Sequence, residues 1–244
     1  MYETTRLSTE EMAAVAAYAA RARWPSGFTV YQRGAAADGV FVVLRGRVLL
    51  RTRVKSGRGF ITSVATHGLT FGGEGLATSA RTGAVYVTDA RADDDTETLY
   101  LSGSRFRAFV RERPMHAFAL VGQVMAEHAA LLDKLRELAT LSVEQRLVAA
   151  LVRMARQQMF VGGDGGVALD AAQYRVLCEL VGATRESVSL VVNRLVAEGL
   201  VERRDGGIAI APVSELLARM KEATDKAADT PAPVAADRSE RLTV

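Results

Sequence analysis

The segment Gly182-Ala-Thr-Arg-Glu-Ser-Val-Ser-Leu-Val-Val-Asn-Arg-Leu195 decides the fold of the C-terminal part of this chain. The run before it, 174–181, has apolar residues at helical spacing, and Gly182 ends that helix because glycine tolerates a left-handed backbone. Thr184 is a favourable N-cap, so a second helix is predicted from Arg185 to about Glu198. Two helices joined by a glycine turn are typical of a helix-turn-helix.

The residues after the second helix predict a β-hairpin. Two short runs, Leu200–Glu202 and Ile208–Ile210, flank the sequence Arg203-Arg204-Asp205-Gly206-Gly207. An Asp-Gly pair between such runs is a strong signal for a tight turn joining antiparallel strands. A hairpin in this position is a wing, so the pattern predicts a winged helix-turn-helix.

The start of the second helix carries the side chains that would read double-stranded DNA. In a helix-turn-helix, these N-terminal residues reach base edges in the major groove. Arg185 can donate two hydrogen bonds to guanine, and Glu186 can accept one from cytosine. The alternative is that the two form a solvated surface pair. Wing arginines would contact phosphates without reading sequence. The expected DNA-contacting residues are Thr184, Arg185, Glu186, Ser187, Ser189, Leu190, Asn193, Arg194, Arg203 and Arg204.

The first hundred residues have a different pattern. Residues 1–24 are predicted to form a short helical lead-in, with Ser8 as its N-cap and Glu11 as the capping-box partner. From Phe28 to about Leu101, short apolar runs are separated by glycines, which is typical of an all-β roll or barrel. The predicted strands are 28–31, 40–44, 48–54, 60–65, 84–87 and 98–101.

A long helical region is predicted from Ser104 to about Gln158. Within it, apolar residues recur at alternating spacings of three and four, the pattern of a coiled-coil seam. We expect this helix to pair with its twin in a homodimer; the alternative is that the same face packs on the β-roll. His128 has no second ligand at i+4, so no metal site is expected. The expected seam is Phe118, Val121, Met125, His128, Leu132 and Leu135.

Composition narrows the class of protein. Cys178 is the only cysteine, which excludes an internal disulfide and an iron–sulfur cluster within one chain. No apolar run approaches the roughly 20 residues of a membrane span, and the N-terminus lacks the layout of a secretion signal. A cytoplasmic protein without a membrane partner is therefore expected. No paired nucleophile and base or metal-ligand spacing occurs, so an enzyme is not expected.

Three segments together resemble the CRP/FNR superfamily of bacterial transcription regulators. They are Gly182–Ser189 with Asn193-Arg194-Leu195, Asp38–Val48 and Ser142–Leu147, which resemble the family's recognition helix, nucleotide-binding fold and hinge. The resemblance implies a homodimer on a palindromic site, contact with RNA polymerase and a place on the bacterial nucleoid. Leu190 departs from the pattern, because cyclic-AMP-responsive members place a base-reading arginine there.

The expected fold is α+β. We predict an N-terminal helix and a cyclic-nucleotide-binding-type β-roll in 1–114 and a long dimerisation helix in 115–140. A winged helix-turn-helix is expected in 141–222, followed by a disordered tail in 223–244, which is rich in Ala, Asp, Pro and Thr.

The resemblance also implies an effector site in the β-roll. Phe71–Leu76 and Arg81–Ala84 are similar to the family's cyclic-nucleotide cassette, in which a glutamate accepts from the ribose and an arginine holds the phosphate. The loop between them is shorter than in cyclic-AMP receptors, and two leucines replace hydroxyl side chains on the long helix. Three hypotheses stay open: an empty pocket or unknown effector, cyclic AMP or a related nucleotide, and haem or another redox cofactor at His67. The expected effector-binding residues are Gly73, Glu74, Gly75, Leu76, Arg81, Thr82, Leu131 and Leu132.

A second function is also open: a cyclic-nucleotide receptor that acts through protein partners, with the helix-turn-helix as a docking surface. Salt dependence separates the two, because DNA binding weakens steeply as salt rises and counterions are released.

Overall fold

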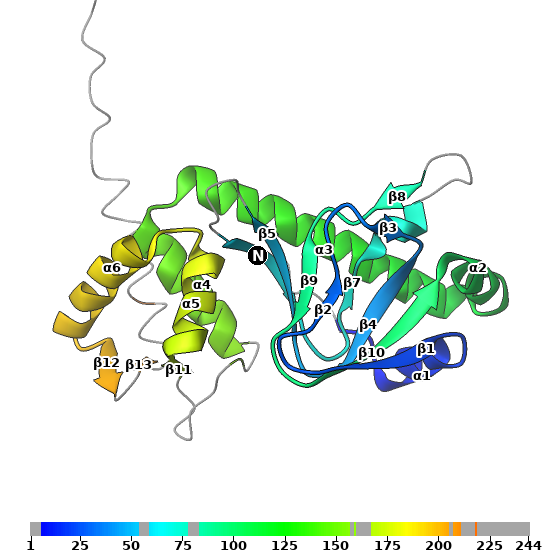
Figure 1. Cartoon of the computed structure of the whole chain (residues 1–244), viewed down its shortest axis with the longest axis horizontal. Helices are drawn as coiled ribbons and strands as arrows, with labels where there is room; N and C mark the ends of the chain where they lie inside the picture. Colours follow the sequence, from blue (N-terminus) through cyan, green and yellow to red (C-terminus); the bar gives the residue numbers. More distant parts are fainter. Residues whose placement is uncertain are drawn as a thin grey trace, which may run out of the picture. The chain divides into compact units, whose positions relative to one another are not determined.

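A computed structural model describes residues 6–53, 59–77, 83–156, 159, 167–204, 207–210 and 218. The chain divides into two compact units (Figure 1): 1–141 with 178–184, and 142–177 with 185–244. The tail predicted to be disordered, 223–244, lies outside the described residues.

The N-terminal unit opens with helix α1 (Thr9–Ala16), and its predicted capping box is confirmed. Ser8 Oγ accepts from the Glu11 N–H at 3.2 Å, and Glu11 Oε2 accepts from the Ser8 N–H at 2.7 Å. The prediction that the helical lead-in continues to residue 24 is wrong. Strand β1 (Ala20–Trp24) pairs with β10 (Thr96–Ser102) instead, and Trp24 Nε1 donates to Thr98 Oγ1 at 2.9 Å.

The predicted β-roll is confirmed as two four-stranded antiparallel sheets and a short pair, β3–β8. One sheet has the order β1-β10-β4-β7 and the other β2-β9-β5-β6, so the turn at Gly46 (φ +83°) carries the chain from one sheet to the other. The remaining strands are β2 (Thr29–Tyr31), β3 (Ala36–Ala37), β4 (Gly39–Arg45), β5 (Val48–Arg53), β6 (Gly59–Ala65), β7 (Thr70–Phe71), β8 (Ala84–Val85) and β9 (Asp89–Ala92).

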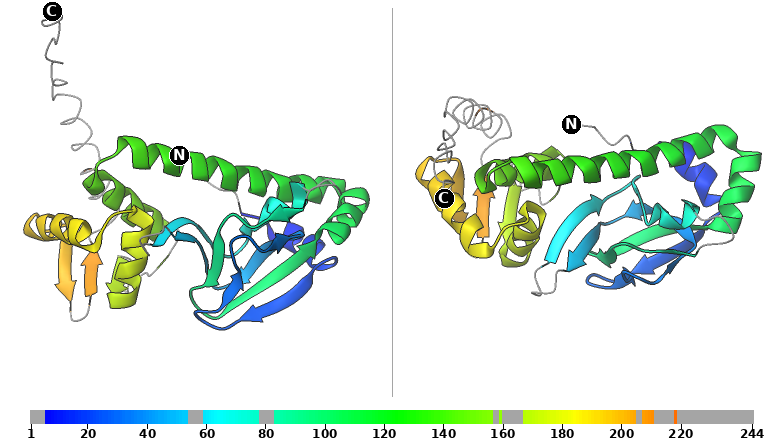
Figure 2. Two further views of the ribbon diagram at one scale, coloured as in Figure 1. Left: turned by 45° about the horizontal axis from the view of Figure 1, so that its top comes forward. Right: turned by 90° about the horizontal axis from the view of Figure 1, so that it is seen from above.

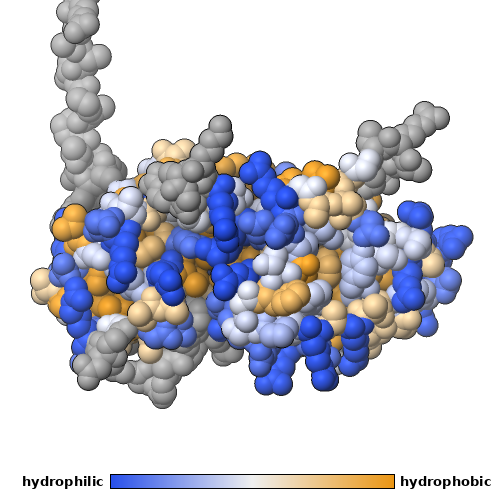
Figure 3. Space-filling view, viewed as in Figure 1, coloured by the Kyte–Doolittle hydropathy of each residue, from blue (hydrophilic) through white to orange (hydrophobic). Residues whose placement is uncertain are grey.

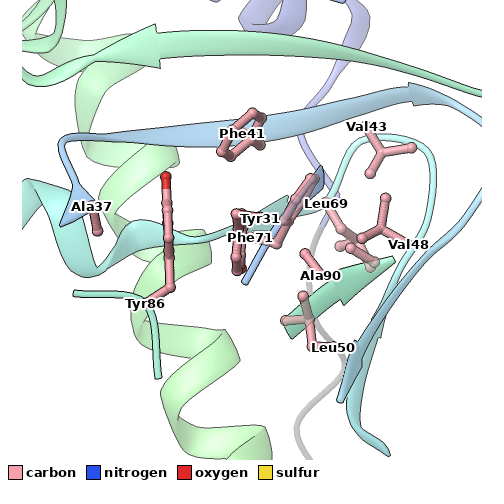
Figure 4. Packing of buried hydrophobic residues seen from close by; sticks show 11 residues of the cluster. Tyr31, Ala37, Phe41, Val43, Val48, Leu50, Leu69, Phe71, Tyr86 and Ala90 are labelled. Carbon is pink, nitrogen blue, oxygen red and sulfur yellow. The ribbon is translucent and has the colours of Figure 1, made fainter. Parts of the chain in front are cut away.

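Buried aromatic and aliphatic residues fill the roll. The rings of Tyr31, Phe41, Phe71 and Tyr86 gather beside β4 (Figure 4). Tyr31 and Tyr86 stack with ring centroids 3.6 Å apart and planes within 9°. Phe41 and Phe71 stack at 4.9 Å, so the interior of the roll is an aromatic core.

The predicted helical stretch from 104 to 158 is interrupted twice. Helix α2 (Gly103–Glu112) ends before Pro114, where a residue preceding proline is disfavoured in helical conformation. Helix α3 (Pro114–Thr140) runs along the roll in both views of Figure 2 and buries Ala117 and Leu120 against it. It ends at Leu141, whose backbone is extended.

The C-terminal unit begins with α4 (Val143–Arg156), for which Ser142 and Gln145 form a reciprocal cap. Strands β12 (Val201–Arg204) and β13 (Gly207–Ile210) confirm the predicted wing hairpin, while its turn at Asp205-Gly206 lies outside the described residues. Strand β11 (Val167–Asp170) was not predicted; it pairs with β13 and completes a three-stranded sheet.

The helix-turn-helix itself is confirmed. Helix α5 (Ala171–Val181) begins three residues earlier than predicted, and α6 (Arg185–Ala197) is the second helix. Gly182 between them has φ +66°, the left-handed conformation that the glycine was expected to supply.

Candidate recognition helix and effector site

Helix α6 has one buried face and one exposed polar face. Val188, Val192 and Leu195 are at most 2% exposed, so they fix the helix in its unit. The opposite face exposes the expected base-reading side chains and one leucine, Leu190, which is 71% exposed. On and just before α6, the exposed members of the expected set are Arg185, Glu186, Leu190, Asn193 and Arg194, while Thr184, Ser187 and Ser189 are partly buried.

Three side-chain contacts hold this surface in place. Arg194 Nη1 donates to Glu144 Oε2 at 2.7 Å, which ties α6 to α4. The hydroxyls of Ser189 and Tyr174 are 3.2 Å apart, so this serine is engaged with α5. In the wing, exposed Arg203 donates to Asn193 Oδ1, which links the hairpin to the recognition helix. The structure therefore brings together the wing and the exposed face of α6 as one surface.

The expected effector cassette lies on the 3-10 helix η1 (Gly73–Ala77). A side chain at Gly75 would start 2.3 Å from the Gly39 backbone nitrogen, so this position requires glycine for close packing of two backbone segments. Glu74 Oε1 accepts from the Val87 N–H at 3.2 Å. Arg81 and Thr82 lie outside the described residues, and the proposed carboxylate–arginine pair is therefore a prediction that the structure does not test.

The two leucines of the predicted effector set differ in exposure. Leu131 is partly buried, whereas Leu132 is 55% exposed and belongs to the predicted seam. His67, the candidate haem ligand, has Nδ1 2.7 Å from the Leu44 carbonyl oxygen. Among the described residues no group of three or more His, Cys, Asp or Glu is placed to hold a metal ion.

Glu127 of α3 was not among the expected site residues, yet its side chain interacts electrostatically with Glu74 of η1. Burial, followed by the negative charge of Glu74, raises the pKa of Glu127 to about 8. The same two glutamates act on Tyr31, whose pKa is raised by burial first. A signal was present in the sequence, because Glu127 is the only Asp, Glu, Lys or Arg between Pro114 and Leu132.

The predicted dimer seam is exposed on a single chain. Phe118 is 73% exposed, Met125 62% and Leu135 54%. Figure 3 shows hydrophobic residues along the edge where α3 runs in Figure 1. His128 is exposed as well. The alternative that this face packs on the roll of the same chain is therefore not what the structure shows.

Comparison with known proteins agrees with both units. The cyclic nucleotide-binding domain model matches residues 21–113, and the Crp-like helix-turn-helix domain model matches residues 145–219. The chain belongs to the CRP/FNR family. Its members are transcription regulators with an effector-binding domain and a helix-turn-helix DNA-binding domain, and this chain has both.

The relatives cover most of the chain. The cyclic AMP receptor protein of Thermus thermophilus is 28% identical over 84% of this chain and 89% of its own length. The cAMP-activated global transcriptional regulator CRP of Salmonella typhimurium is 22% identical over 77% of this chain and 88% of its own length. The solved structure of CLP, a c-di-GMP responsive global regulator of Xanthomonas campestris, has a TM-score of 0.71 at 21% identity. It covers 84% of this chain and 100% of that one, and shows the same CRP/FNR fold.

Proposed function

We propose that this CRP/FNR regulator binds a palindromic DNA site as a homodimer, with α6 in the major groove. The observation that carries the proposal is the exposed polar face of α6, which begins with Arg185 and Glu186 and is fixed by a buried apolar face behind it. The first turn of a recognition helix is where base contacts concentrate. Arg185 would read guanine, Glu186 would accept from cytosine, and Arg203 would add a phosphate contact.

The exposed apolar residues of α3 support the homodimer. A stripe of large apolar side chains on a surface helix is costly in water and marks an interface. By length and composition alone, α3 would also suit a membrane span. The helix packs Leu120 into the roll and carries five charged residues in its second half, so a second copy is the better partner. Those charges are Glu127, Asp133, Lys134, Arg136 and Glu137.

Gly122 adds to this argument. It lies inside α3, where glycine is destabilising by about 1 kcal/mol relative to alanine. A side chain there would meet nothing within 4 Å in its own chain. No contact within the chain explains a glycine at this exposed position, but the missing side chain would allow the backbone of a second helix to approach closely. We therefore place the crossing of the two α3 helices near Gly122.

The effector is proposed to bind in the β-roll, at η1. The relatives are named for cyclic AMP and for cyclic di-GMP, so a cyclic nucleotide is the first class to test here. The regulator would act in the cytoplasm on the bacterial nucleoid, and RNA polymerase would be its protein partner during activation.

A fluorescence-anisotropy titration of a palindromic operator tests the proposal, with the wild type, Arg185→Ala and Arg203→Ala. A bidentate base contact contributes roughly 1–3 kcal/mol of discrimination, so Arg185→Ala should relax specificity by about tenfold or more at one base pair. Arg203→Ala should weaken all sequences similarly. Unchanged specific affinity for Arg185→Ala would contradict the proposal. Operator affinity that is insensitive to salt would favour the protein-docking alternative.

A further inference from the structure

The turn of the helix-turn-helix belongs to the same compact unit as the roll and α3. Residues 178–184, which comprise the end of α5, the Gly182 turn and Thr184, fall in that unit. The chain passes from Thr184 directly into α6 at Arg185. Side chains of the roll and of α3 that contact residues 178–184 therefore act on the segment that leads into the recognition helix.

An ion pair joins strand β5 to this segment. Arg51 donates from Nε to Glu179 Oε2 at 2.8 Å and from Nη2 to the other carboxylate oxygen, so the contact is bidentate. The two side chains are only 16% and 22% exposed, so solvent screens the pair less than an exposed one. The register of β5 and β6 shifts between Leu50 and Arg51, and such bulges re-aim side chains. A side chain at Gly59 would start 2.8 Å from Glu179 Oε1, so a glycine at the start of β6 leaves room for the pair.

A lysine of α3 binds the backbone of the same segment. Lys134 is 7% exposed, and its ammonium group donates to the Leu180 carbonyl oxygen in the last turn of α5. The last four carbonyl groups of a helix lack partners inside the helix, and a positive charge is favourable there. The ammonium nitrogen also lies 3.7 Å from Glu137 Oε2 and 5.7 Å from the centroid of the Phe60 ring. Lysine is rarely buried unless it is paired, and Lys134 is buried where it caps α5.

The Gly182 turn packs against apolar side chains of the roll and of α3. A side chain at Gly182 would start 2.9 Å from Phe60 Cε2 on β6 and 3.0 Å from Leu138 Cδ2 on α3. This position therefore requires glycine for close packing as well as for its φ of +66°. The turn-holding residues are Arg51, Phe60, Lys134 and Leu138.

These contacts leave the base-reading face of α6 exposed. Arg185 and Glu186 are exposed, and Leu190 is 71% exposed, so the turn-holding residues do not mask them. Two of the turn-holding residues, Lys134 and Leu138, lie on α3, whose exposed seam is the proposed dimer interface. Two recognition helices must lie about one DNA turn apart, roughly 34–36 Å, to read a palindrome. A turn fixed to α3 would set that distance in the dimer.

We propose that Arg51 and Lys134 are positioning residues that hold the turn before α6, so that the dimer accepts one spacing between its two half-sites. The inference rests on the proposed function and adds a selectivity that base contacts do not supply. Arg185 reads the sequence of each half-site, whereas the turn-holding residues determine how far apart the two half-sites lie. Without the ion pair and the helix cap, the dimer adapts to several spacings.

Palindromic operators whose spacers differ by one or two base pairs test this proposal in an anisotropy titration of the full chain. Each added base pair moves the half-sites apart by about 3.4 Å and rotates one against the other by roughly 35°, so wild type should prefer one spacing by about tenfold or more. Arg51→Ala and Lys134→Met should reduce this preference to about threefold or less, with the base preference within each half-site unchanged. Arg53→Ala is the control, because it removes the same charge from an exposed position of β5 and should keep the wild-type spacing preference.

An exchange of charges separates the ion pair from a general effect on folding. Arg51→Glu and Glu179→Arg should each remove the spacing preference, because each brings two like charges together, and the double variant should regain most of it. Hydrogen exchange of the free chain is a second measurement, made without DNA. The amides of 178–184 should exchange faster by about tenfold or more in Arg51→Glu and return toward the wild-type rate in the double variant. Exchange in residues 188–195 should stay at the wild-type rate, which would show that α6 remains folded.

Four results would overturn the positioning role. They are equal binding of all spacings by wild type, single variants that keep the wild-type spacing preference, a double variant no better than either single one, and unchanged exchange of 178–184 in Arg51→Glu. Where wild type still prefers the correct half-site sequence, each of these results contradicts the positioning role alone. A wild type that prefers neither sequence nor spacing would contradict the proposed function as well, so the two failures can be distinguished.

Discussion

The recognition helix and the roll site differ in how the chain brings their residues together. The expected base-reading residues fall within 184–194, and a single helix on a buried apolar face presents them. The roll site combines residues 31, 74, 86 and 127, which come from strand β2, the 3-10 helix η1, the segment between β8 and β9, and α3. A site within one helix depends on local rules of capping and periodicity, whereas a site made from distant segments depends on how backbones pack. The two should therefore respond differently to substitution.

The largest effect is expected where the roll site needs close backbone contact. In Gly75→Ala the new methyl group would overlap the backbone of Asp38 and Gly39, with contacts of 2.7 and 2.3 Å. We expect the free energy of unfolding to fall by about 3 kcal/mol, because overpacking against backbone cannot be relieved by a rotamer change. Urea unfolding followed by circular dichroism measures it. Gly83→Ala is the control, since its methyl would meet nothing within 4 Å, and it should change stability by less than about 0.5 kcal/mol. Equal stability of the two variants would contradict the packing argument.

The next largest effect is expected at the exposed seam of α3, which contributes to neither site within one chain and is the proposed dimer interface. Phe118→Asp should place a charge in the proposed dimer interface and weaken association by about 2 kcal/mol or more, as expected for an aromatic anchor. Sedimentation velocity over a concentration series measures the monomer–dimer equilibrium. Arg111→Ala, at an exposed position on α2, should leave it unchanged. A dimer as stable in Phe118→Asp as in wild type would show that the two copies meet elsewhere.

The sequence predicted the helix-turn-helix, the wing and the roll because each has a local signature. Two signals can be recognised without any knowledge of tertiary contacts. One is the glycine turn with its N-cap, Gly182 and Thr184, and the other is the alternation of short apolar runs with glycines. The elements that were predicted wrongly or not at all depend instead on partners far away in the sequence. Strand β1 was interpreted as helical because its paired residues in β10 lie 72 to 80 positions away in the sequence, as between Trp24 and Thr96 or Ala20 and Tyr100. Strand β11 was not predicted because its partner is a strand of the wing. Glu127 could not be assigned to the roll site because only tertiary packing brings α3 to η1.

A smaller effect is expected from the pH dependence of the roll site. The pKa of Glu127 is raised in the folded chain to about 8, while an unfolded glutamate titrates near 4.3. The folded state therefore holds its proton more tightly, and stability falls as pH rises from about 4.3 to about 8 and is level above that. Glu127→Gln should match wild type near pH 5 and be more stable by about 1 kcal/mol at pH 8.5, since partial exposure reduces the full linkage. Thermal unfolding of both proteins at the two pH values measures this difference in stability. A variant less stable than wild type at pH 8.5 would contradict the raised pKa of Glu127.

The smallest effect tests the recognition helix at the position where it departs from the family pattern. Leu190 is 71% exposed on the same face as Arg185, an unusual place for a leucine unless it meets an apolar group in the groove. The methyl group of thymine is the apolar feature that the major groove offers. Leu190→Ala removes part of such a contact, worth about 1 kcal/mol, so preference for thymine at one base pair should fall by less than tenfold. Competition binding with operators that differ at single base pairs measures this preference. A uniform loss across all operators, as expected for Arg203→Ala, would assign Leu190 to packing against the sugar-phosphate backbone and leave base reading to Arg185 and Glu186.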